Sequence, residues 1–308
     1  MHNVALIGLG AVGAIYANRL NRLLTKEHFH VIVDEKRKEK YEREGIYLNG
    51  EYAEFAYITE DEISSQYDLL IVATKNNHLE QVAPLLKKCT GEKTVILSLL
   101  NGIDSEKYIG SIVGIDHLLY SFATAIDSTR SANRVDYSTE GIIYMGESDN
   151  SRSERLLAVA ELFEKASITC TIPQDIHREL WVKFMVNVSI NTVSAITRAT
   201  YGDCVAIDEI RELIIAVQKE VIALAEKEGI EGLTEKYIDH YQKIFASLEK
   251  DKKTSMLQDI EAGRVSENRW FCMTASQLAK EHDLDTPLID TLGKILQGID
   301  QVHHNRIC

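Results

Sequence analysis

Three glycines near the start of the chain are spaced for binding a dinucleotide. Gly8, Gly10 and Gly13 form the pattern G-x-G-x-x-G directly after the apolar run Val4–Ile7, and residues 14–24 have a helical pattern. In such a unit the first glycine makes a tight turn, the second lets the backbone approach a pyrophosphate, and the third lets helix and strand pack closely. The helix N-terminus then offers unpaired N–H groups to the phosphates. The predicted contacts with the dinucleotide are Gly8, Leu9, Gly10, Ala11, Val12 and Gly13.

An acidic residue stands where the adenosine ribose of that dinucleotide should lie. The strand predicted at Phe29–Val33 is followed by Asp34, roughly twenty residues beyond the glycine turn. A carboxylate there favours the free 2′-hydroxyl of NAD. Lys36, followed by Arg37 and Lys38, could instead hold the 2′-phosphate of NADP, or this could be a solvated basic turn. The choice between NADP and NAD therefore stays open.

A helix predicted over Ile176–Ile196 carries a polar stripe on an otherwise apolar surface. A helix of this composition is normally buried. Lys183, Asn187 and Asn191 recur at every fourth residue, and Ser194 lies near the same face. Buried polar groups must find partners. A bound ligand could supply them, and so could water or a neighbouring helix.

Two further polar groups follow strands of the predicted sheet. Lys75 comes shortly after the strand Leu69–Ala73, and Asn101 comes after the strand Thr94–Ser98. Ligands of open α/β sheets bind at the carboxyl ends of the strands, so both residues are candidates for the nicotinamide end of the site. The alternatives are a solvated loop lysine and a plain turn.

A carboxylate is predicted at the start of a later helix. Ser266 would be the N-cap of a helix over Glu267–Glu281, and Glu267 would lie in its first turn. The helix dipole would help to keep that carboxylate ionised. Taken alone, the pair is typical of ordinary helix capping.

The pattern of elements that must position these residues changes near Pro173. Before it, strands and helices alternate, as in a parallel sheet with crossover helices. After it, the pattern is almost entirely helical. We expect an α/β protein with an N-terminal Rossmann-type dinucleotide-binding domain, residues 1–172, and an all-helical C-terminal domain, residues 173–308. A ligand is expected in a cleft between the two domains.

The remaining predicted elements follow the same division. In the first domain, further strands are expected at Leu118–Ala125, Arg134–Tyr137, Ile142–Met145 and Thr169–Ile172, and helices at Glu35–Glu44, Leu79–Lys88 and Ser153–Ala166. In the second domain, further helices are expected at Glu209–Glu228, Glu235–Leu248 and Leu288–Val302.

The composition excludes several classes of protein. The 308 residues carry a net charge of −13, which argues against a nucleic-acid partner because no basic surplus would neutralise phosphates. Five dispersed cysteines indicate reduced thiols. No apolar run approaches the ~20 residues that span a membrane, and the chain opens with a strand rather than a signal peptide. The adjacent His303 and His304 lie in a polar tail and are not expected to bind a metal. We expect a cytoplasmic protein.

Taken together, these blocks resemble the ketopantoate reductase (2-dehydropantoate 2-reductase) family. The resemblance rests on the GLGAVG turn, Lys75, Asn101-Gly102, ELWVKFMVNVSINTVSAI at 179–196 and TSMLQDIEAGRVSE at 254–267. Their order and spacing match over essentially the whole chain. The W-x-K-x-x-x-N-x-x-x-N block and the S-M-x-x-D block are far more specific than the glycine motif.

The resemblance implies reduction of 2-dehydropantoate to pantoate, in pantothenate and coenzyme A biosynthesis, with NADPH. Lys183 would protonate the new alkoxide, and Glu267 would hold the hydroxyl of substrate or product. A lysine ammonium suits this step because hydride transfer places negative charge on the carbonyl oxygen. The resemblance assigns Lys75 and Asn101 to the cofactor, and Asn187, Asn191 and Ser255 to the substrate. A homodimer through the helical domain is expected.

The sequence also departs from the family's pattern around the implied substrate. The departures are Thr192, Tyr201, Asn268, Arg269 and Met273. They leave the lysine and the glutamate in place but alter the expected pocket wall, so the substrate could be another 2-oxo acid. The alternatives are therefore a related reductase or opine-type dehydrogenase, and a nucleotide-sensing protein without catalysis.

Overall fold

The computed structural model describes residues 1–307, with side chains up to His303. Contacts within the chain divide it into two compact units, Met1–Ile176 and His177–Cys308. The predicted boundary between residues 172 and 173 falls in the short segment before α6 (Ile176–Val186). Among the described residues, no helix is both long and apolar enough to cross a membrane.

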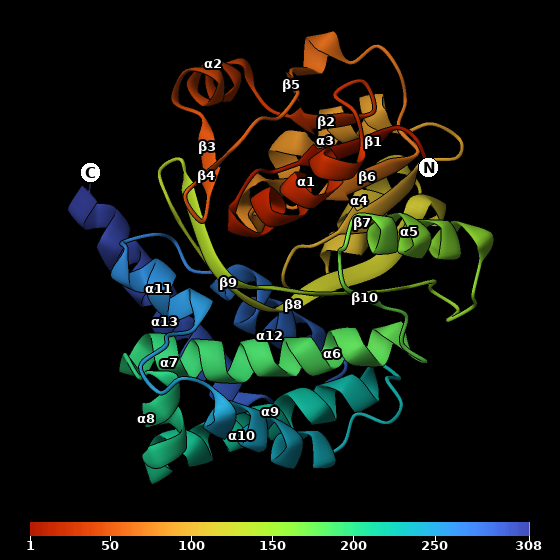
Figure 1. Ribbon diagram of the computed structural model, residues 1–308. Helices are drawn as coiled ribbons and strands as arrows, with labels where there is room; N and C mark the ends of the chain where they lie inside the picture. The colour runs from red at the N-terminus through yellow and green to blue at the C-terminus, as the bar shows by residue number, and fades with distance from the viewer. Residues whose placement is uncertain (308) are drawn as a thin grey trace. The chain divides into compact units, whose positions relative to one another are not determined.

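The first unit is built on a sheet of ten strands within the described residues (Figure 1). Its parallel core has the order β7-β6-β1-β2-β5. The bounds are β7 Val95–Ser98, β6 Leu69–Val72, β1 Val4–Ile7, β2 Phe29–Ile32 and β5 Tyr57–Ile58. The chain passes from β1 to β2 on one side, while β6 lies on the other side of β1. This is the strand arrangement at which doubly wound folds bind ligands.

The parallel core is buried on both faces. Val4 and Leu6 of β1 belong to one apolar core, together with residues of α1 (Ala11–Leu23) and α5 (Glu154–Lys165). Ala5 and Ile7 belong to a second core. That core includes residues of α3 (Leu79–Cys89) and α4 (Ser105–Val113). The alternation follows from the period of two along a strand, and it explains why β1 is apolar at every position.

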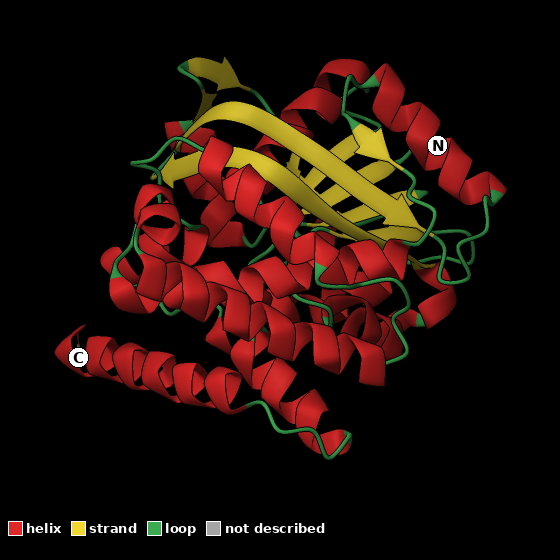
Figure 2. Ribbon diagram, turned by 90° about the horizontal axis from the view of Figure 1, so that it is seen from below, coloured by secondary structure: helices red, strands yellow, loops and turns green. Residues whose placement is uncertain are grey.

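Beyond β7 the sheet continues through a long antiparallel pair. This pair is β8 (Leu118–Ser131) and β9 (Arg134–Gly146), visible as two long curved strands in Figure 2. Three short strands were predicted for this region, and this prediction was wrong because the structure has two long ones. The backbone has a positive φ at Ala125 and at Gly141, and the register shifts after Asp127, but pairing continues through these irregularities. The other strands of the sheet are β3 (Ile46–Leu48), β4 (Glu51–Ala53) and β10 (Cys170–Thr171).

The second unit consists of helices and loops in its described residues. The helices after α6 are the π-helical turn η4 (Asn187–Asn191), α7 (Thr192–Thr197), α8 (Tyr201–Ala206), α9 (Asp208–Lys227), α10 (Lys236–Ser247), α11 (Ser255–Glu261), the 3₁₀ turn η5 (Asn268–Trp270), α12 (Cys272–Glu281) and α13 (Pro287–Ile307). The expected fold class, a Rossmann-type unit followed by a helical unit, is confirmed.

Two predicted helices differ from the observed ones. The helix predicted over Ile176–Ile196 is interrupted by η4, a wider turn of a kind found mostly at functional sites. The helix predicted from Glu267 begins only at Cys272, because Phe271 has φ −115° and ψ −91°. Ser266 is therefore not the N-cap of α12, and Glu267 precedes a 3₁₀ turn instead of lying in the first turn of an α-helix.

Candidate functional site

The glycine turn between β1 and α1 has two glycines that the fold itself requires. Gly8 has φ +102°, and a Cβ there would lie 2.5 Å from the backbone of Ala73 and Thr74. A Cβ on Gly13 would lie 2.0 Å from the carbonyl oxygen of Gly8. Both positions therefore need glycine so that strand, turn and helix can pack.

Gly10 is different, because its own surroundings leave room for a side chain. The nearest atom to a Cβ there is the carbonyl oxygen of Ala73, at 3.9 Å. Gly10 is also the N-cap residue of α1, and no side chain caps the helix. Leu9 is buried, and Ala11 and Val12 pack against the core, so the turn presents backbone to its open side. An open cradle at an uncapped helix N-terminus fits a dinucleotide pyrophosphate.

The loops after β6 and β7 lie at the same sheet edge as this turn, since β1, β6 and β7 are parallel neighbours. The side chain of Asn76 is buried, and its Nδ2 donates to the carbonyl oxygen of Asn101 at 2.8 Å. Lys75 is exposed at the start of this loop. The Oγ1 of Thr74 is buried without a hydrogen-bond partner, a feature that no sequence pattern predicted. Lys75 and Asn101 are thus brought together with the glycine turn.

Asp34 lies at the same edge, just beyond β2. It is the N-cap of α2 (Glu35–Glu44), where Oδ1 accepts the N–H of Arg37 at 2.7 Å. Its Oδ2 accepts from the guanidinium of Arg37 at 2.5 Å. The Nζ of Lys38 lies 2.5 and 2.6 Å from the two carboxylate oxygens of Glu62. Lys36 is exposed. Two of the three basic residues after Asp34 are thus paired with carboxylates.

In the second unit, the predicted polar stripe is partly satisfied by the protein itself. The Nδ2 of Asn191 donates to Oδ1 of Asn187 at 3.3 Å. The Oγ of Ser194 lies 2.7 Å from Oγ1 of Thr254, the N-cap of α11, so this end of the stripe bonds to a neighbouring helix. The Nδ2 of Asn187 is buried without a hydrogen-bond partner. It lies one helical turn from the half-buried Lys183 and is suited to donate to a ligand oxygen.

The other two predicted site residues lie on connections between helices. Glu267 is half-buried and stands between Ser266 and Asn268, both 2% exposed. Ser255 is exposed at the first position of α11. The hydrogen bond that joins Ser194 to Thr254 fixes the start of α11, and so fixes the backbone beside Ser255.

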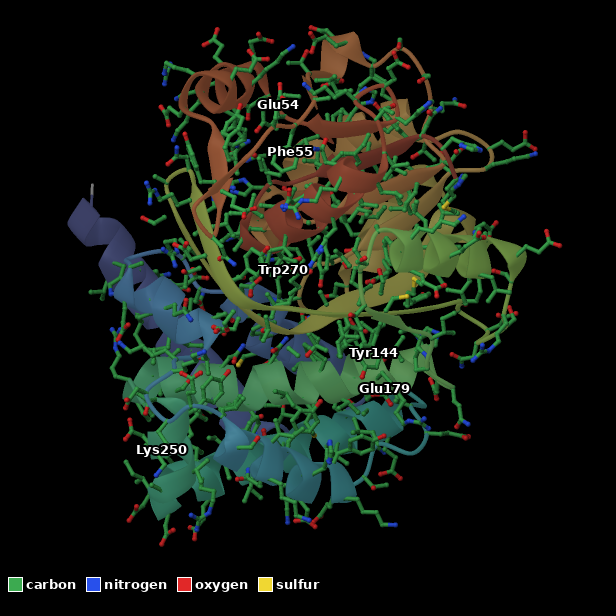
Figure 3. The ribbon with its side chains drawn as sticks, in the orientation of Figure 1. Glu54, Phe55, Tyr144, Glu179, Lys250 and Trp270 are labelled. Atoms are coloured by element: carbon green, nitrogen blue, oxygen red, sulfur yellow. The ribbon has the colours of Figure 1, made fainter. Side chains whose placement is uncertain are left out.

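The departures from the family's pattern have specific places in the structure. The N–H groups of Tyr201 and Gly202 donate to the carbonyl oxygens of Lys252 and Lys250, both at 2.9 Å, and so hold the loop that leads to α11. Figure 3 labels Lys250 of this loop. Two other departures are Arg269, two residues after Glu267, and Met273, directly after Cys272. The guanidinium of Arg269 lies 5.0 Å above the ring of Trp270, and Met273 is 43% exposed at the start of α12.

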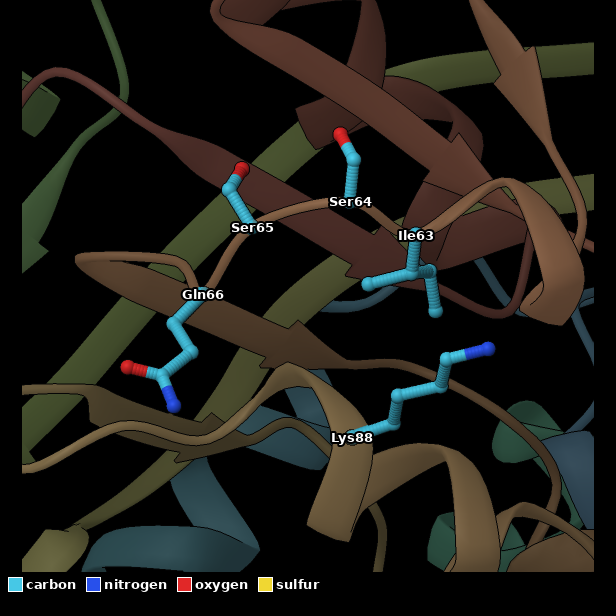
Figure 4. Close-up of a pocket in the computed structure, with 5 residues that line it drawn as sticks. All are labelled: Ile63, Ser64, Ser65, Gln66 and Lys88. Carbon is cyan, nitrogen blue, oxygen red and sulfur yellow. The ribbon is translucent and has the colours of Figure 1, made fainter.

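Two surface hollows of about 380 Å³ are lined by residues other than the predicted site residues. One is lined by Ile63, Ser64, Ser65, Gln66 and Lys88 (Figure 4). The other is lined by Arg198, Ile295, Gly298, Ile299, Val302 and His303. Neither contains a predicted site residue, so the site is identified by its chemistry rather than by surface shape. The described residues include no group of three or more His, Cys, Asp or Glu side chains placed to hold a metal ion.

Comparison with known proteins agrees with the fold described above. The chain is 26% identical to the 2-dehydropantoate 2-reductase of Archaeoglobus fulgidus, over 97% of this chain and 98% of that protein. Its fold is similar to that of a D-mandelate dehydrogenase solved with NADH and anilino(oxo)acetate, with a TM-score of 0.88, 20% identity, and coverage of 98% and 99% of the two chains. It is also similar to a dimeric ketopantoate reductase of Staphylococcus aureus, with a TM-score of 0.83, 22% identity, and coverage of 98% and 99%.

Two family models cover most of the chain. Residues 4–150 match the model described as ketopantoate reductase PanE/ApbA. Residues 175–300 match the model described as its C-terminal part. The chain therefore belongs to the ketopantoate reductase family of oxidoreductases.

Proposed function

We propose that the protein reduces a small 2-oxo acid to the 2-hydroxy acid with a nicotinamide dinucleotide, and that 2-dehydropantoate is the substrate. The observation that carries this proposal is the stripe of Lys183, Asn187 and Asn191, which leaves one buried amide donor without a protein partner. An uncapped, open glycine turn in the other unit supports the dinucleotide.

Each site residue has a defined part in this reaction. The N-terminus of α1 would hold the pyrophosphate of a dinucleotide, which would supply the hydride when bound. The ammonium of Lys183 stabilises the negative charge that develops on the carbonyl oxygen and then donates its proton to that oxygen. Asn187 Nδ2 donates to a substrate oxygen, and Glu267 accepts a hydrogen bond from the hydroxyl of substrate or product.

For the dinucleotide we propose NADH rather than NADPH. The carboxylate of Asp34 caps α2 by accepting a hydrogen bond from the N–H of Arg37, so this N–H is not available to a 2′-phosphate. At about 5 Å from such a phosphate, the carboxylate would cost about 1–3 kcal/mol of binding free energy for each unit of phosphate charge. Asp34 is half-exposed, so the lower end applies, and we expect roughly tenfold weaker binding of NADPH. The hydroxyls of the NADH ribose can instead donate to this carboxylate.

Equilibrium binding tests this preference without any substrate. We expect NADH to bind roughly tenfold more tightly than NADPH, and Asp34→Ala to reduce the ratio of the two Kd values. Tighter binding of NADPH by the unchanged protein would mean that Lys36 and Arg37 hold a 2′-phosphate after all.

A second substrate class is favoured by the residues beside Glu267. Arg269 and Trp270 form a stacked cationic and aromatic pair in the segment that carries this carboxylate. The similar D-mandelate dehydrogenase was solved with anilino(oxo)acetate, an oxo acid that carries an aryl amino group. An aryl 2-oxo acid is therefore the second candidate.

A panel of 2-oxo acids distinguishes the two substrate classes. It should contain 2-dehydropantoate, its smaller aliphatic analogues and phenylglyoxylate, each assayed with NADH and with NADPH. We expect the highest kcat/KM for 2-dehydropantoate. A higher value for phenylglyoxylate would favour the second class. Tight dinucleotide binding with no turnover of any oxo acid would refute the enzymatic proposal.

We also propose that the protein is a homodimer, as the similar Staphylococcus aureus protein is. The candidate interface is the apolar side of α13, where Ile295 is 42% and Val302 is 48% exposed and both line the second hollow. Light scattering should give twice the chain mass, and Val302→Asp should shift it toward the single chain. A single-chain mass for the unchanged protein would refute the proposal.

A further inference from the structure

The residues on either side of Glu267 are fixed by one face of α13. Asp300 accepts two hydrogen bonds from Ser266, from its N–H at 3.0 Å and from its Oγ–H at 2.6 Å. Asn268 donates through Nδ2 to the carbonyl oxygen of Gly293 at 2.8 Å. Ser266 and Asn268 are also joined directly, because Ser266 Oγ accepts the N–H of Asn268 at 3.3 Å. Glu267 thus stands between two buried neighbours that are both tied to the same helix.

The spacing along α13 explains how one helix reaches both neighbours. Gly293, Leu296 and Asp300 are separated by three and four residues, so they lie along one face over two turns. Leu296 is fully buried on this face. A Cβ on Gly293 would lie 3.0 Å from Cβ of Cys272, at the start of α12. A glycine inside a helix costs about 0.5–1 kcal/mol relative to alanine, and here it allows α12 and α13 to approach closely.

Glu267 itself has no regular helix to hold it. It precedes the 3₁₀ turn η5, with φ −85° and ψ 19°, and α12 begins five residues later at Cys272. The direction of its carboxylate therefore depends on tertiary contacts of this segment. The pair of bonds to Asp300 is one charged contribution to those contacts, and hydrogen bonds to a carboxylate are stronger than neutral ones.

We propose that Asp300 is a positioning residue for the reaction, which holds the Glu267 carboxylate in place through Ser266. The inference rests on the proposed function, in which Glu267 holds the hydroxyl of substrate or product. Asp300 acts through the backbone and hydroxyl of Ser266 and has no assigned contact with substrate. Its removal should lower kcat without weakening dinucleotide binding, because the glycine turn belongs to the other unit.

The chain offers a matched control on the same helix α13. The Oγ of Ser276 in α12 donates to Asp290 in α13, so a second serine–aspartate bond reaches α13 from a segment other than the one that carries Glu267. Asp300→Ala removes both bonds beside Glu267, while Ser266→Ala removes the bond from Oγ–H and keeps the bond from the backbone N–H. Asp290→Ala and Ser276→Ala remove a bond of the same chemistry elsewhere. Asp300→Asn keeps an acceptor for the N–H of Ser266 and serves as the conservative variant.

We expect Asp300→Ala to lower kcat about tenfold or more, since a small misplacement of a catalytic group can cost up to about a hundredfold. Dinucleotide Kd should stay within about twofold of the unchanged protein. Ser266→Ala should show a smaller loss in the same direction, and Asp300→Asn should recover most of kcat. The two control variants should keep kcat within about twofold.

Hydrogen exchange provides a second measurement that does not need turnover. The peptide covering residues 264–271 should exchange faster in Asp300→Ala and not in Asp290→Ala. Unchanged exchange in this peptide would overturn the inference, and so would faster exchange with an unchanged kcat. Equal losses of kcat in the Asp300 and Asp290 variants would also overturn it. If the unchanged protein reduces no 2-oxo acid, the proposed function fails, while the exchange measurement still decides whether Asp300 fixes the segment.

Discussion

Substituting alanine at Gly10 and at Gly13 should separate dinucleotide binding from folding. At Gly10 the added methyl group meets no protein atom closer than 3.9 Å, so the fold can accept it. The methyl group then stands where the pyrophosphate must approach the backbone. At Gly13 the same methyl group would lie 2.0 Å from the carbonyl oxygen of Gly8, which is backbone and cannot move independently.

The expected magnitudes follow from these distances. Gly10→Ala should change the free energy of unfolding by less than about 1 kcal/mol, because it exchanges one residue at an N-cap. It should weaken dinucleotide binding by about 1.5–3 kcal/mol, the value of a hydrogen bond to a charged group, or roughly tenfold to a hundredfold in Kd. Gly13→Ala should destabilise the protein by about 3 kcal/mol or more. In a unit of this size that lowers Tm by roughly 6–12 °C.

The assay pairs thermal unfolding without ligand with fluorescence titration of NADH. Only Gly13→Ala should lower Tm strongly, while Gly10→Ala should lose binding and keep its Tm. If Gly10→Ala bound NADH as tightly as the unchanged protein, the glycine turn would not be the pyrophosphate site. A large loss of Tm in Gly10→Ala would show that the space around this residue is not open.

Three further predictions concern acid stability, thiol reactivity and the substrate site. Burial raises the pKa of Glu147, but hydrogen bonds from Arg155 and Ser153 outweigh burial and hold it below its usual value. Its stabilisation is therefore present above about pH 4.3 and is lost as pH falls through the lowered pKa. Glu147→Gln should lower the free energy of unfolding, measured in urea, by about 1–3 kcal/mol at pH 7 and by less at pH 3. An equal loss at both pH values would contradict this prediction. Burial raises the pKa of Cys272 to about 11, so a disulfide reagent should modify it only in unfolded protein, and rapid labelling of the native chain would contradict the structure. Asn187→Ala should raise KM for the 2-oxo acid about tenfold to a hundredfold at unchanged dinucleotide Kd, and an unchanged KM would remove this amide from the site.

The sequence predicts best those elements whose signals are local. The strand Val4–Ile7 and the helix Glu35–Glu44 have the predicted bounds. In the first case an apolar run ends at a glycine turn. In the second, Asp34 caps the helix and Gly45, with φ +69°, ends it. Local chemistry alone decides both ends of such elements.

The elements that sequence reasoning missed depend on distant contacts. The β3–β4 hairpin pairs through β3 with Arg134 and Val135 of β9, which lie far along the chain. The helix predicted from Glu267 is displaced because Ser266 bonds to Asp300 rather than capping α12. A serine followed by a glutamate has the same local pattern whether it caps a helix or docks on another one, so only the tertiary structure distinguishes the two.

The site follows the same division. Backbone positions such as Gly8 and Gly13 could be predicted because their chemistry is steric and local. The sequence could not predict which members of the polar stripe bond to the protein. Ser194 bonds to Thr254, while the Nδ2 of Asn187 is buried without a hydrogen-bond partner. Which member of the stripe faces another helix depends on how α7 and α11 pack, and spacing alone contains no information about that packing.

In the proposed reaction, the ammonium of Lys183 supplies the proton for reduction of a 2-oxo acid. This role is tested by the single-turnover rate of Lys183→Met with saturating NADH and 2-oxo acid, measured together with the Kd of NADH. We expect a rate lower by about 10²–10⁴, the range for loss of a general acid, and a Kd within about twofold of the unchanged protein. A rate close to that of the unchanged protein would contradict it.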